Sequence, residues 1–426
     1  MRAAALALVA VGFFVTLLPG PWGADDVTDL PIYAAYADAF LAGALPYRDV
    51  PFEYPPLAAP LLALPGLGGN YEPAFGLLAL ALACAVVLLA GAIAVRTGGD
   101  RREALLAAAA LPLLLGAIVR ARFDLAPVAL VLGGLLLVCS ARPRAGMAAL
   151  GLGAATKLFP LLIAPVVLAW LVARGQRRAA AESAAVLAIV LLAIFGAAAA
   201  LSPAGLVDSL TYHVERPVQV ESTPAVVLNA LGALGAEEPR PVHSHGSDGL
   251  LHPASGLVSG GFMALLAATL VGLVLGVGRG RSGTLELVLA SLTAVAAFAA
   301  FGKVLSPQFL IWVAPLGALA LAWRMHALAA AVAAASLLTL VEFPARYEDV
   351  LARTPTALTL VAARDIALVG VVVLACRELA SGPSRNVRQG MTRPRQRQAR
   401  TQGARIAALF GRLRTPHGGD LGPSFR

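Results

Sequence analysis

The stretch 146–173, GMAALGLGAATKLFPLLIAPVVLAWLVA, carries one charged residue, Lys157, in an otherwise apolar run. It is longer than the roughly 20 residues with which one helix crosses a bilayer. The KLFP sequence also interrupts a helix, because proline disfavours a helical conformation in the residue before it. We therefore interpret the stretch as two short helices that meet near Lys157. A lysine at membrane depth costs about 2.5–3.5 kcal/mol on insertion scales, so it indicates a functional role.

Lysine is almost absent from the rest of the chain. Of 33 lysines and arginines in 426 residues, only two are lysines, Lys157 and Lys303. Lys303 lies between two apolar runs in AAFGKVLSPQFLIWVAP (299–315). The bland alternatives are a helix-end charge for Lys157 and a snorkelling boundary lysine for Lys303. The near-absence of lysine elsewhere favours a functional placement for both.

The composition predicts a polytopic membrane protein. Hydrophobic residues make up 59% and charged residues 13%, whereas a soluble domain carries about 25% charged residues. The net charge of +9 does not indicate nucleic-acid binding, because the arginines are spread over short loops and one tail. The three cysteines lie in apolar runs and imply no disulfide framework. We interpret the N-terminal apolar segment as an uncleaved first span.

Apolar runs predict an all-α membrane helix bundle of about 12 spans, within a range of about 10–13. Residues 1–380 would form this membrane domain, and the arginine-rich tail 381–426 would be disordered and cytoplasmic. The short, proline-rich segment 57–67 is expected to be interfacial or re-entrant. Besides the two helices within 146–173, the predicted spans are 3–19, 71–95, 103–119, 125–141, 180–201, 257–278, 284–301, 304–323, 326–341 and 357–377.

The arginine loops predict the topology. If 146–173 crosses twice, one side receives Arg2, Arg96, Arg101, Arg102, Arg142, Arg144, Arg174, Arg177, Arg178, Arg279, Arg281, Arg324 and Arg377. The positive-inside rule makes that side cytoplasmic. Both termini are then cytoplasmic, in the cell membrane. The opposite, outer side receives both lysines and the segments 20–56, 120–124, 202–256 and 342–356.

The first outer loop is acidic and begins a helix. Residues from Leu30 onwards have helical apolar spacing, which predicts an amphipathic helix on the membrane surface. Asp29 directly precedes it, where a carboxylate is a good N-cap. The alternative is a carboxylate at the membrane boundary that acts as a general base. Asp26 is the other carboxylate considered for that role.

Three blocks carry a family resemblance: TDLPIYAAYADAFLAGALPYRDVPFEYPPL (28–57), TKLFPLLIAPVVLAW (156–170) and GKVLSPQFLIWVAPL (302–316). Together they resemble the GT-C superfamily of polyprenyl-phosphate-sugar-dependent glycosyltransferases, and most closely glycosyltransferase family 87, an actinobacterial mannosyltransferase-like group. The resemblance implies an outward-facing catalytic site, a lipid-linked sugar donor and an aspartate base in the first outer loop. That role carries over to Asp29.

Other candidates follow from the chemistry of such a transfer. A departing phosphate needs cations, and Lys303, Lys157 and Arg122 could supply them; Arg122 could instead pair with Asp124 at a helix junction. The further candidates for substrate binding are Asp26, Tyr33, Tyr54, Asp124, His213 and Gln308.

Some polar residues are interpreted structurally. Trp312 is expected to be a membrane-interface anchor. The histidines and aspartate of 243–252 have no strict metal-ligand spacing, so we expect a flexible loop there and no metal.

We therefore expect an integral-membrane, inverting hexosyltransferase that moves mannose from a polyprenyl-phosphate donor to a glycolipid or cell-envelope glycan. No cofactor and no nucleic acid are expected. The alternative is a transporter or lipid flippase, because broken helices and intramembrane charge also mark transport sites. The alanine and arginine richness is compatible with an actinobacterial source.

Overall fold

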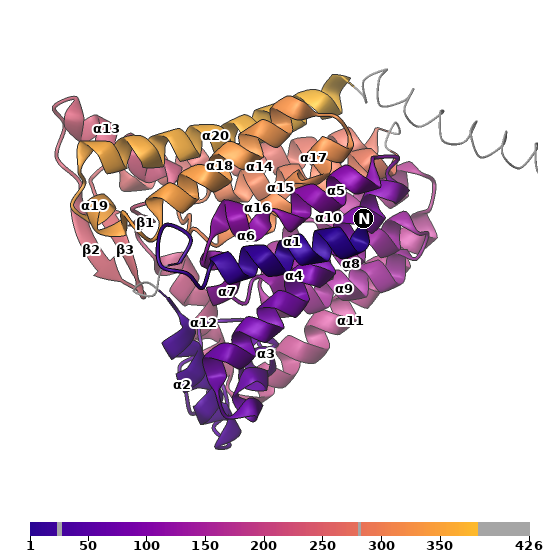
Figure 1. Ribbon diagram of the computed structural model, residues 1–426, viewed down its shortest axis with the longest axis horizontal. Helices are drawn as coiled ribbons and strands as arrows, with labels where there is room; N and C mark the ends of the chain where they lie inside the picture. Colours follow the sequence, from indigo (N-terminus) through magenta and orange to yellow (C-terminus); the bar gives the residue numbers. More distant parts are fainter. Residues whose placement is uncertain (24–27, 280–282, 382–426) are drawn as a thin grey trace, which may run out of the picture. The chain divides into compact units, whose positions relative to one another are not determined.

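The computed structural model describes residues 1–23, 28–279 and 283–381, and these residues are mostly helical (Figure 1). Within them, five helices are long and apolar enough to cross a membrane. The sequence therefore predicts the all-α class correctly, while the number of about 12 spans is not confirmed. The five long helices are α4 (Tyr71–Arg96), α11 (Arg177–Leu201), α14 (Ser255–Gly278), α15 (Thr284–Phe301) and α20 (Pro355–Ser381).

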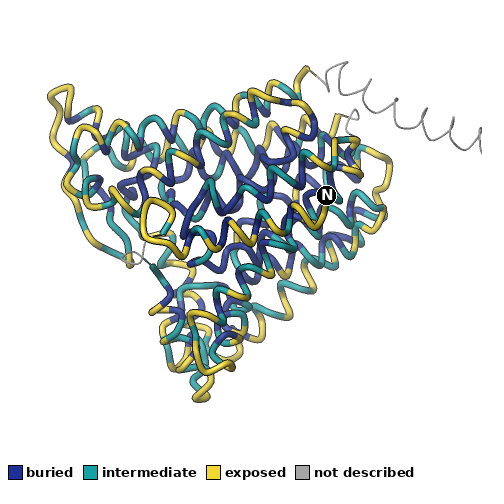
Figure 2. The backbone as a smooth tube through the Cα atoms, viewed as in Figure 1, coloured by how far each residue is buried: buried dark blue, intermediate teal, exposed yellow. Residues whose placement is uncertain are grey.

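The long helices differ in how far the protein itself covers them. In the most apolar window of α15, 83% of the residues are buried, against 6% for α11 and 17% for α14. Helix α15 therefore lies in the core, while α11 and α14 expose most of their apolar side chains (Figure 2). Exposed apolar surface on this scale is stable against lipid, where a helix satisfies its backbone groups internally.

Shorter helices account for most of the other predicted spans. Helices α1, α8, α9, α10 and α18 are too short to meet the length of a full span. The short helices begin with α1 (Arg2–Val15), α2 (Leu30–Leu41), α3 (Ala58–Ala63), η1 (Leu64–Gly68), α5 (Arg101–Ala109), α6 (Leu111–Leu115), α7 (Ile118–Ala121) and α8 (Leu125–Cys139). They continue with α9 (Pro143–Thr156), η2 (Phe159–Leu162), α10 (Ala164–Ala173), α12 (Pro203–Glu215), α13 (Thr223–Ala233), α16 (Phe309–Gly317), α17 (Leu319–Ala322), α18 (His326–Glu342) and α19 (Tyr347–Leu351).

Two predicted spans are wrong as single helices. The segment 103–119 is divided between α5, α6 and α7. Pro112 stands in the first turn of α6, and Gly116 ends that helix with a positive φ of 62°. The predicted span 304–323 begins its helix only at Phe309, and Pro315 lies inside α16. Proline removes a backbone donor and clashes with the preceding turn, so apolar composition alone misjudges these segments.

The stretch 146–173 is broken at Lys157, as predicted. Helix α9 ends at Thr156, Lys157 has an extended backbone, and α10 begins after the short 3-10 helix η2. The carbonyl of Ala155 accepts a hydrogen bond from the backbone nitrogen of Leu57, at 2.8 Å. The apolar segment before α3 therefore satisfies one of the carbonyls that the end of α9 leaves unpaired.

A small antiparallel sheet occupies the region expected to be a flexible loop, so that expectation is wrong. Its strands β1 (Val218–Gln219), β2 (Arg240–Ser244) and β3 (Ser247–Leu251) are ordered β1-β3-β2. Ser244 pairs with Ser247, which leaves His245 and Gly246 as a two-residue turn, both with positive φ. Such a turn matches the twist of a hairpin, and glycine at its second position favours it.

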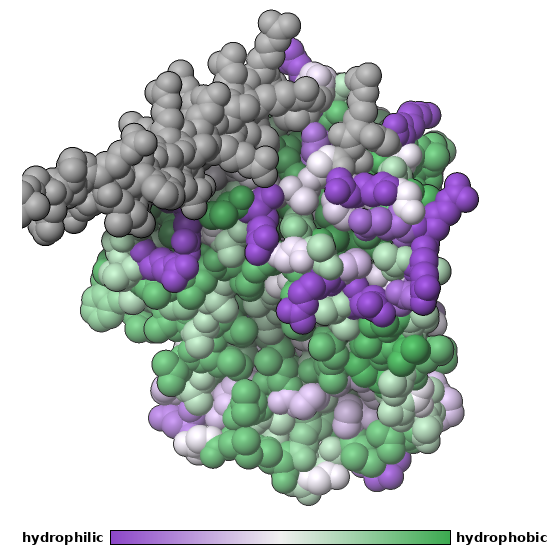
Figure 3. All heavy atoms as spheres, turned by 90° about the vertical axis from the view of Figure 1, so that its right-hand side faces the viewer, coloured by the Kyte–Doolittle hydropathy of each residue, from purple (hydrophilic) through white to green (hydrophobic). Residues whose placement is uncertain are grey.

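The predicted topology assigns the connections to two groups, one with the arginine loops and one with the candidate site. One group is tied by bonds from Asp100 N to the carbonyl of Ala322 (2.9 Å) and from Thr284 Oγ1 to that of Arg96 (2.9 Å). Figure 3 looks onto the right-hand side of Figure 1 and shows many hydrophilic side chains there. The other group contains the candidate site. The predicted tail 381–426, apart from its first residue, and Asp26 lie outside the described residues.

We expect Gly146→Ala to destabilise the protein. A Cβ at Gly146 in α9 would stand 2.5 Å from Val138 Cγ2 and 2.7 Å from the Gly134 carbonyl oxygen, both in α8. Such overpacking costs about 1–3 kcal/mol. Thermal unfolding in detergent measures it. Gly133→Ala in α8 is the control, because its Cβ would meet nothing within 4 Å. Equal unfolding temperatures for the two variants would contradict close packing of α8 on α9.

Candidate active site

Asp29, at the start of α2, turns its carboxylate away from the helix backbone. The Asp29 side chain makes no N-cap hydrogen bond. Instead Thr28 Oγ1 accepts the bond from the Leu30 nitrogen, at 3.2 Å. Asp29 Oδ2 forms an ion pair with Arg122 and accepts a hydrogen bond from the Tyr33 hydroxyl, at 3.2 Å. The alternative in which Asp29 serves only as a helix cap therefore loses its structural basis.

Asp124 forms a second ion pair, with Lys157. The Lys157 Nζ lies 2.7 Å from Asp124 Oδ1 and 2.9 Å from Oδ2. Asp124 is 0% exposed and the Lys157 side chain 15% exposed. A buried carboxylate needs a charge partner and hydrogen bonds for all its acceptors. Both residues lie where the helices are interrupted, which frees their side chains to meet.

Trp312 completes the partners of Asp124, so its predicted role as an interface anchor is wrong. Its indole Nε1 donates to Asp124 Oδ1 at 2.5 Å, and the residue is only 3% exposed. The ring stacks on Phe159 with centroids 4.4 Å apart. The apolar surroundings of Trp312 suggested lipid contact, but they are other parts of the protein.

Aromatic rings surround the Lys157 ammonium. Its Nζ lies 4.6 Å from the ring centroid of Phe123, 5.5 Å from that of Trp312 and 5.9 Å from that of Tyr54. Faces of aromatic rings attract a cation, and more strongly where water is excluded. The connection between α2 and α3 provides Tyr54, and the Tyr47 hydroxyl donates to the Tyr54 carbonyl at 2.6 Å.

The tyrosines join the two ion pairs. The Tyr54 ring makes edge contacts with Tyr33 (6.1 Å between centroids) and Phe123 (5.0 Å). Tyr33 donates to Asp29, and Phe123 lies between Arg122 and Asp124 in the chain. The structure thus brings six predicted site residues into one cluster: Asp29, Tyr33, Tyr54, Arg122, Asp124 and Lys157.

His213, in α12, is held next to this cluster. Its Nε2 lies 2.9 Å from the carbonyl oxygen of Glu53, the residue before Tyr54. Burial lowers the pKa of His213, so the ring is neutral at pH 7. Since a carbonyl can only accept, the proton of the neutral ring is on Nε2.

Lys303 lies in the connection between α15 and α16 and contacts the residue that follows His213. Its Nζ donates to the carbonyl of Val214 at 2.6 Å. Gln308 lies five residues further on, and its Oε1 is buried with no hydrogen-bond partner among the described residues. No described contact links Lys303 directly to Lys157 or Arg122.

The histidine-rich hairpin has partners of its own. His243 Nδ1 lies 2.8 Å from Asp248 Oδ1, and His252 Nε2 lies 2.9 Å from the Glu237 carbonyl oxygen. Across the residues that the structure describes, no group of three or more histidine, cysteine, aspartate or glutamate side chains could hold a metal ion.

Sequence reasoning missed three contributors to the site, namely Phe123, Trp312 and the carbonyl of Glu53. The charges of Asp124 and Lys157, each at a break in an apolar run, were a signal for their pairing. Nothing in the sequence indicated which indole would donate to Asp124, because Trp312 is 188 residues away.

The fold and the site define a helical membrane protein with a charged, aromatic-lined cluster at one group of connections. The family model of glycosyltransferase family 87 matches residues 52–307, more than half of the chain. The chain therefore belongs to glycosyltransferase family 87 and is a membrane glycosyltransferase. A search of curated proteins gave no match. The matched range contains Tyr54, Arg122, Asp124, Lys157, His213 and Lys303, but ends before Gln308 and begins after Asp29.

We expect Asp124→Asn to destabilise the protein, because it leaves the Lys157 ammonium without its charge partner. Removing one partner of a buried ion pair costs about 3–5 kcal/mol. Thermal unfolding in detergent measures the loss. The double variant Asp124→Asn with Lys157→Met should regain much of it, since neither charge is then left unpaired. Losses that simply add would contradict the pairing.

Proposed function

We propose that this chain transfers a hexose, mannose in the first instance, from a polyprenyl-phosphate donor to a hydroxyl of a glycolipid or cell-envelope glycan. Membership of family 87 supports sugar transfer and disfavours the transporter or flippase alternative. The single observation behind the proposed mechanism is the ion pair of Asp29 with Arg122, which lies two residues from the Asp124–Lys157 pair. This pair supports the proposal, because the reaction needs a carboxylate to act as base and a cation near the leaving phosphate.

Asp29 is the proposed general base. Both contacts described for its carboxylate use Oδ2, so we assign Oδ1 to the acceptor hydroxyl. Arg122 and Tyr33 orient the carboxylate, which a base requires before it can take a proton. Asp26, the second candidate, lies outside the described residues.

The transfer is a single displacement. Asp29 takes the proton of the acceptor hydroxyl while that oxygen forms a bond to the anomeric carbon. The bond from this carbon to the phosphate oxygen breaks, and the polyprenyl phosphate leaves with the bonding electron pair. Attack opposite the leaving group inverts the configuration at the anomeric carbon.

The donor phosphate is assigned to Lys303, with Lys157 and Arg122 as further cations. Lys157 and Arg122 are paired with carboxylates, whereas Lys303 donates to a neutral backbone carbonyl. Lys303 can therefore turn to a phosphate without leaving a carboxylate unpaired. A cation fixed beside the leaving group stabilises the charge that develops on it.

The remaining polar groups are assigned to the sugar and the acceptor. The buried, unpartnered Oε1 of Gln308 can accept from a sugar hydroxyl, which would remove the penalty of an unsatisfied acceptor. Tyr54 and His213 are proposed to contact the substrates, whereas the buried Tyr33 and Asp124 are proposed to hold Asp29 and Lys157 in place.

The proposed location is the cell membrane, with the site facing outward and both termini in the cytoplasm. The arginines at one group of connections support this orientation. A polyprenyl-linked donor fits this placement, because its tail stays in the bilayer while its phosphate lies at the surface.

We expect Asp29→Asn to abolish transfer. Losing a general base costs about 10²–10⁴-fold in rate. Membranes that contain the protein would receive radiolabelled polyprenyl-phosphate mannose and a mixed glycolipid extract, and labelled product would be measured. Asp38→Asn is the matched control, because Asp38 lies on the same helix and is exposed. Equal rates for wild type and Asp29→Asn would rule out Asp29 as the base.

We expect Lys303→Met to raise the KM for the donor by about tenfold or more, because a hydrogen bond to a charged group contributes about 1.5–3 kcal/mol. Lys303→Arg keeps the charge and should retain most of the affinity. The measurement is initial transfer rate against donor concentration. An unchanged KM in Lys303→Met would remove Lys303 from the phosphate site.

A further inference from the structure

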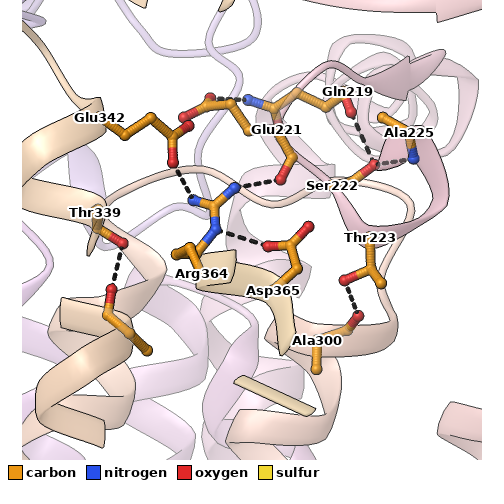
Figure 4. A network of polar contacts seen from close by, with 11 residues as sticks. Gln219, Glu221, Ser222, Thr223, Ala225, Ala300, Thr339, Glu342, Arg364 and Asp365 are labelled. Atoms are coloured by element: carbon orange, nitrogen blue, oxygen red, sulfur yellow. Dashed lines mark hydrogen bonds and ion pairs between the residues drawn. The ribbon is translucent and has the colours of Figure 1, made fainter. Parts of the chain in front are cut away.

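A second buried polar network links α18, α20 and the segment around Glu221 (Figure 4). Its centre is the Arg364 guanidinium of α20, which is 0% exposed. Arg364 Nε lies 2.6 Å from Asp365 Oδ1, its NH1 lies 3.3 Å from Glu342 Oε2 in α18, and its NH2 donates to the backbone carbonyl of Glu221. The network is wholly inside the protein, and none of the residues assigned to the reaction belongs to it.

The network buries more carboxyl groups than cations. Glu221, Glu342 and Asp365 place three carboxyl groups around a single guanidinium, and each is at most 1% exposed. Burial, and then the charge of Glu342, raise the pKa of Glu221, which favours its protonated form and lowers the excess of negative charge. Breaking such a cluster is costly, so it holds its backbone contacts firmly.

The backbone contact of Arg364 falls in the middle of residues 218–223. The Glu221 carbonyl accepts a hydrogen bond from the Arg364 guanidinium, and the Gln219 side chain donates to Glu221 Oε2 at 3.0 Å. Ser222 Oγ donates to the Gln219 carbonyl at 2.7 Å, which closes a tight turn. The segment is therefore anchored from α20 and braced internally.

The two flanks of this segment hold the main chain at Lys303. The backbone nitrogen of Gln219 donates to the Lys303 carbonyl at 3.0 Å. Thr223 Oγ1 donates to the carbonyl of Ala300, three residues before Lys303, at 2.6 Å. The bond from Thr223 ends in the last turn of α15, whose final carbonyls need partners, and the bond from Gln219 ends on the connection that follows this helix.

We propose that residues 218–223 form a positioning element for Lys303 and that buried Arg364 is its anchor. The element fixes the main chain from Ala300 to Lys303, and the side chain of Lys303 then reaches the Val214 carbonyl beside His213. Its effect on donor binding rests on the proposed function of Lys303, whereas the positioning itself does not.

The first test measures the rate at which Lys303 is acylated, in the absence of any sugar donor. Because the chain has only two lysines and the other is buried, acylation followed by peptide mass spectrometry reports on Lys303 alone, with the N-terminal amine as internal reference. Thr223→Val removes the bond to Ala300 and keeps the side-chain shape, so we expect Lys303 to be acylated about three to ten times faster, as for the loss of one hydrogen bond. Thr223→Ser should restore the wild-type rate.

Thr339→Val is the matched control. Thr339 is equally part of the buried region, but its hydroxyl donates to Ala335 within α18, at 2.9 Å, and not to the positioning element. We expect it to leave the acylation rate of Lys303 unchanged. Equal rates in Thr223→Val and wild type, or an equal increase in Thr339→Val, would overturn the proposal.

Arg364→Lys tests the anchor. It keeps the positive charge but cannot contact Glu221, Glu342 and Asp365 at once, because an ammonium lacks the planar fork. We expect faster acylation of Lys303 in this variant as well. If the variant does not fold, the comparison of Thr223→Val with Thr339→Val still decides the question.

A kinetic cycle connects the element to donor binding. Thr223→Val should raise the KM for polyprenyl-phosphate mannose about three- to tenfold with little change in kcat, and should have no further effect in Lys303→Met. Faster acylation with an unchanged KM would support the positioning element while rejecting Lys303 as a donor ligand. A raised KM that persists in full in Lys303→Met would overturn action through Lys303.

Discussion

The Asp124 carboxylate is the interaction on which the rest of the site depends. It lies fully buried and receives the Lys157 ammonium and the Trp312 indole, so it connects two places where helices are interrupted with helix α16. Irregular backbone inside an apolar protein is stable only where its polar groups find partners. Without this carboxylate the lysine would have to leave its aromatic surroundings or lose its charge. The short turn that carries Asp124 also carries Arg122, and therefore fixes the partner of Asp29.

The features that the sequence predicts well are those set by local composition. Long apolar runs predict α4, α11, α14, α15 and α20, because only a helix satisfies its backbone without outside partners. The break at Lys157 follows from a charge and a proline within a few residues. The grouping of Asp29, Arg122 and Lys157 follows in part from topology, which places their connections on one side. The rarity of lysine singles out Lys157 and Lys303, which hydropathy alone does not do.

The features that the sequence does not predict depend on partners far away in the chain. Trp312 and Asp124 are 188 residues apart, and no local pattern distinguishes an indole that faces lipid from one that donates to a buried carboxylate. The 103–119 segment has the hydropathy of a span, but Pro112 and Gly116 divide it. The hairpin around Gly246 is short and polar, so its strands have no apolar alternation to reveal them. In each case a tertiary contact or the conformation of one residue matters more than the average hydropathy of the surrounding sequence.

The two polar clusters use burial in different ways. At the candidate site Arg122 and Lys157 each face a carboxylate, whereas Lys303 donates to a backbone carbonyl, so Lys303 can turn to a phosphate without leaving a carboxylate unpaired. Around Arg364, carboxyl groups outnumber the guanidinium, and the cluster is closed by bonds to backbone. Moving the guanidinium away would leave buried carboxyl groups without their charge partner, which is costly. In the proposed arrangement the main chain at Lys303 is held in place, while the Lys303 side chain can turn from the Val214 carbonyl to the leaving phosphate. Residues 218–223 connect Arg364 with the main chain at Lys303. They do so through the backbone carbonyls of Ala300 and Lys303 and add no charge to the site.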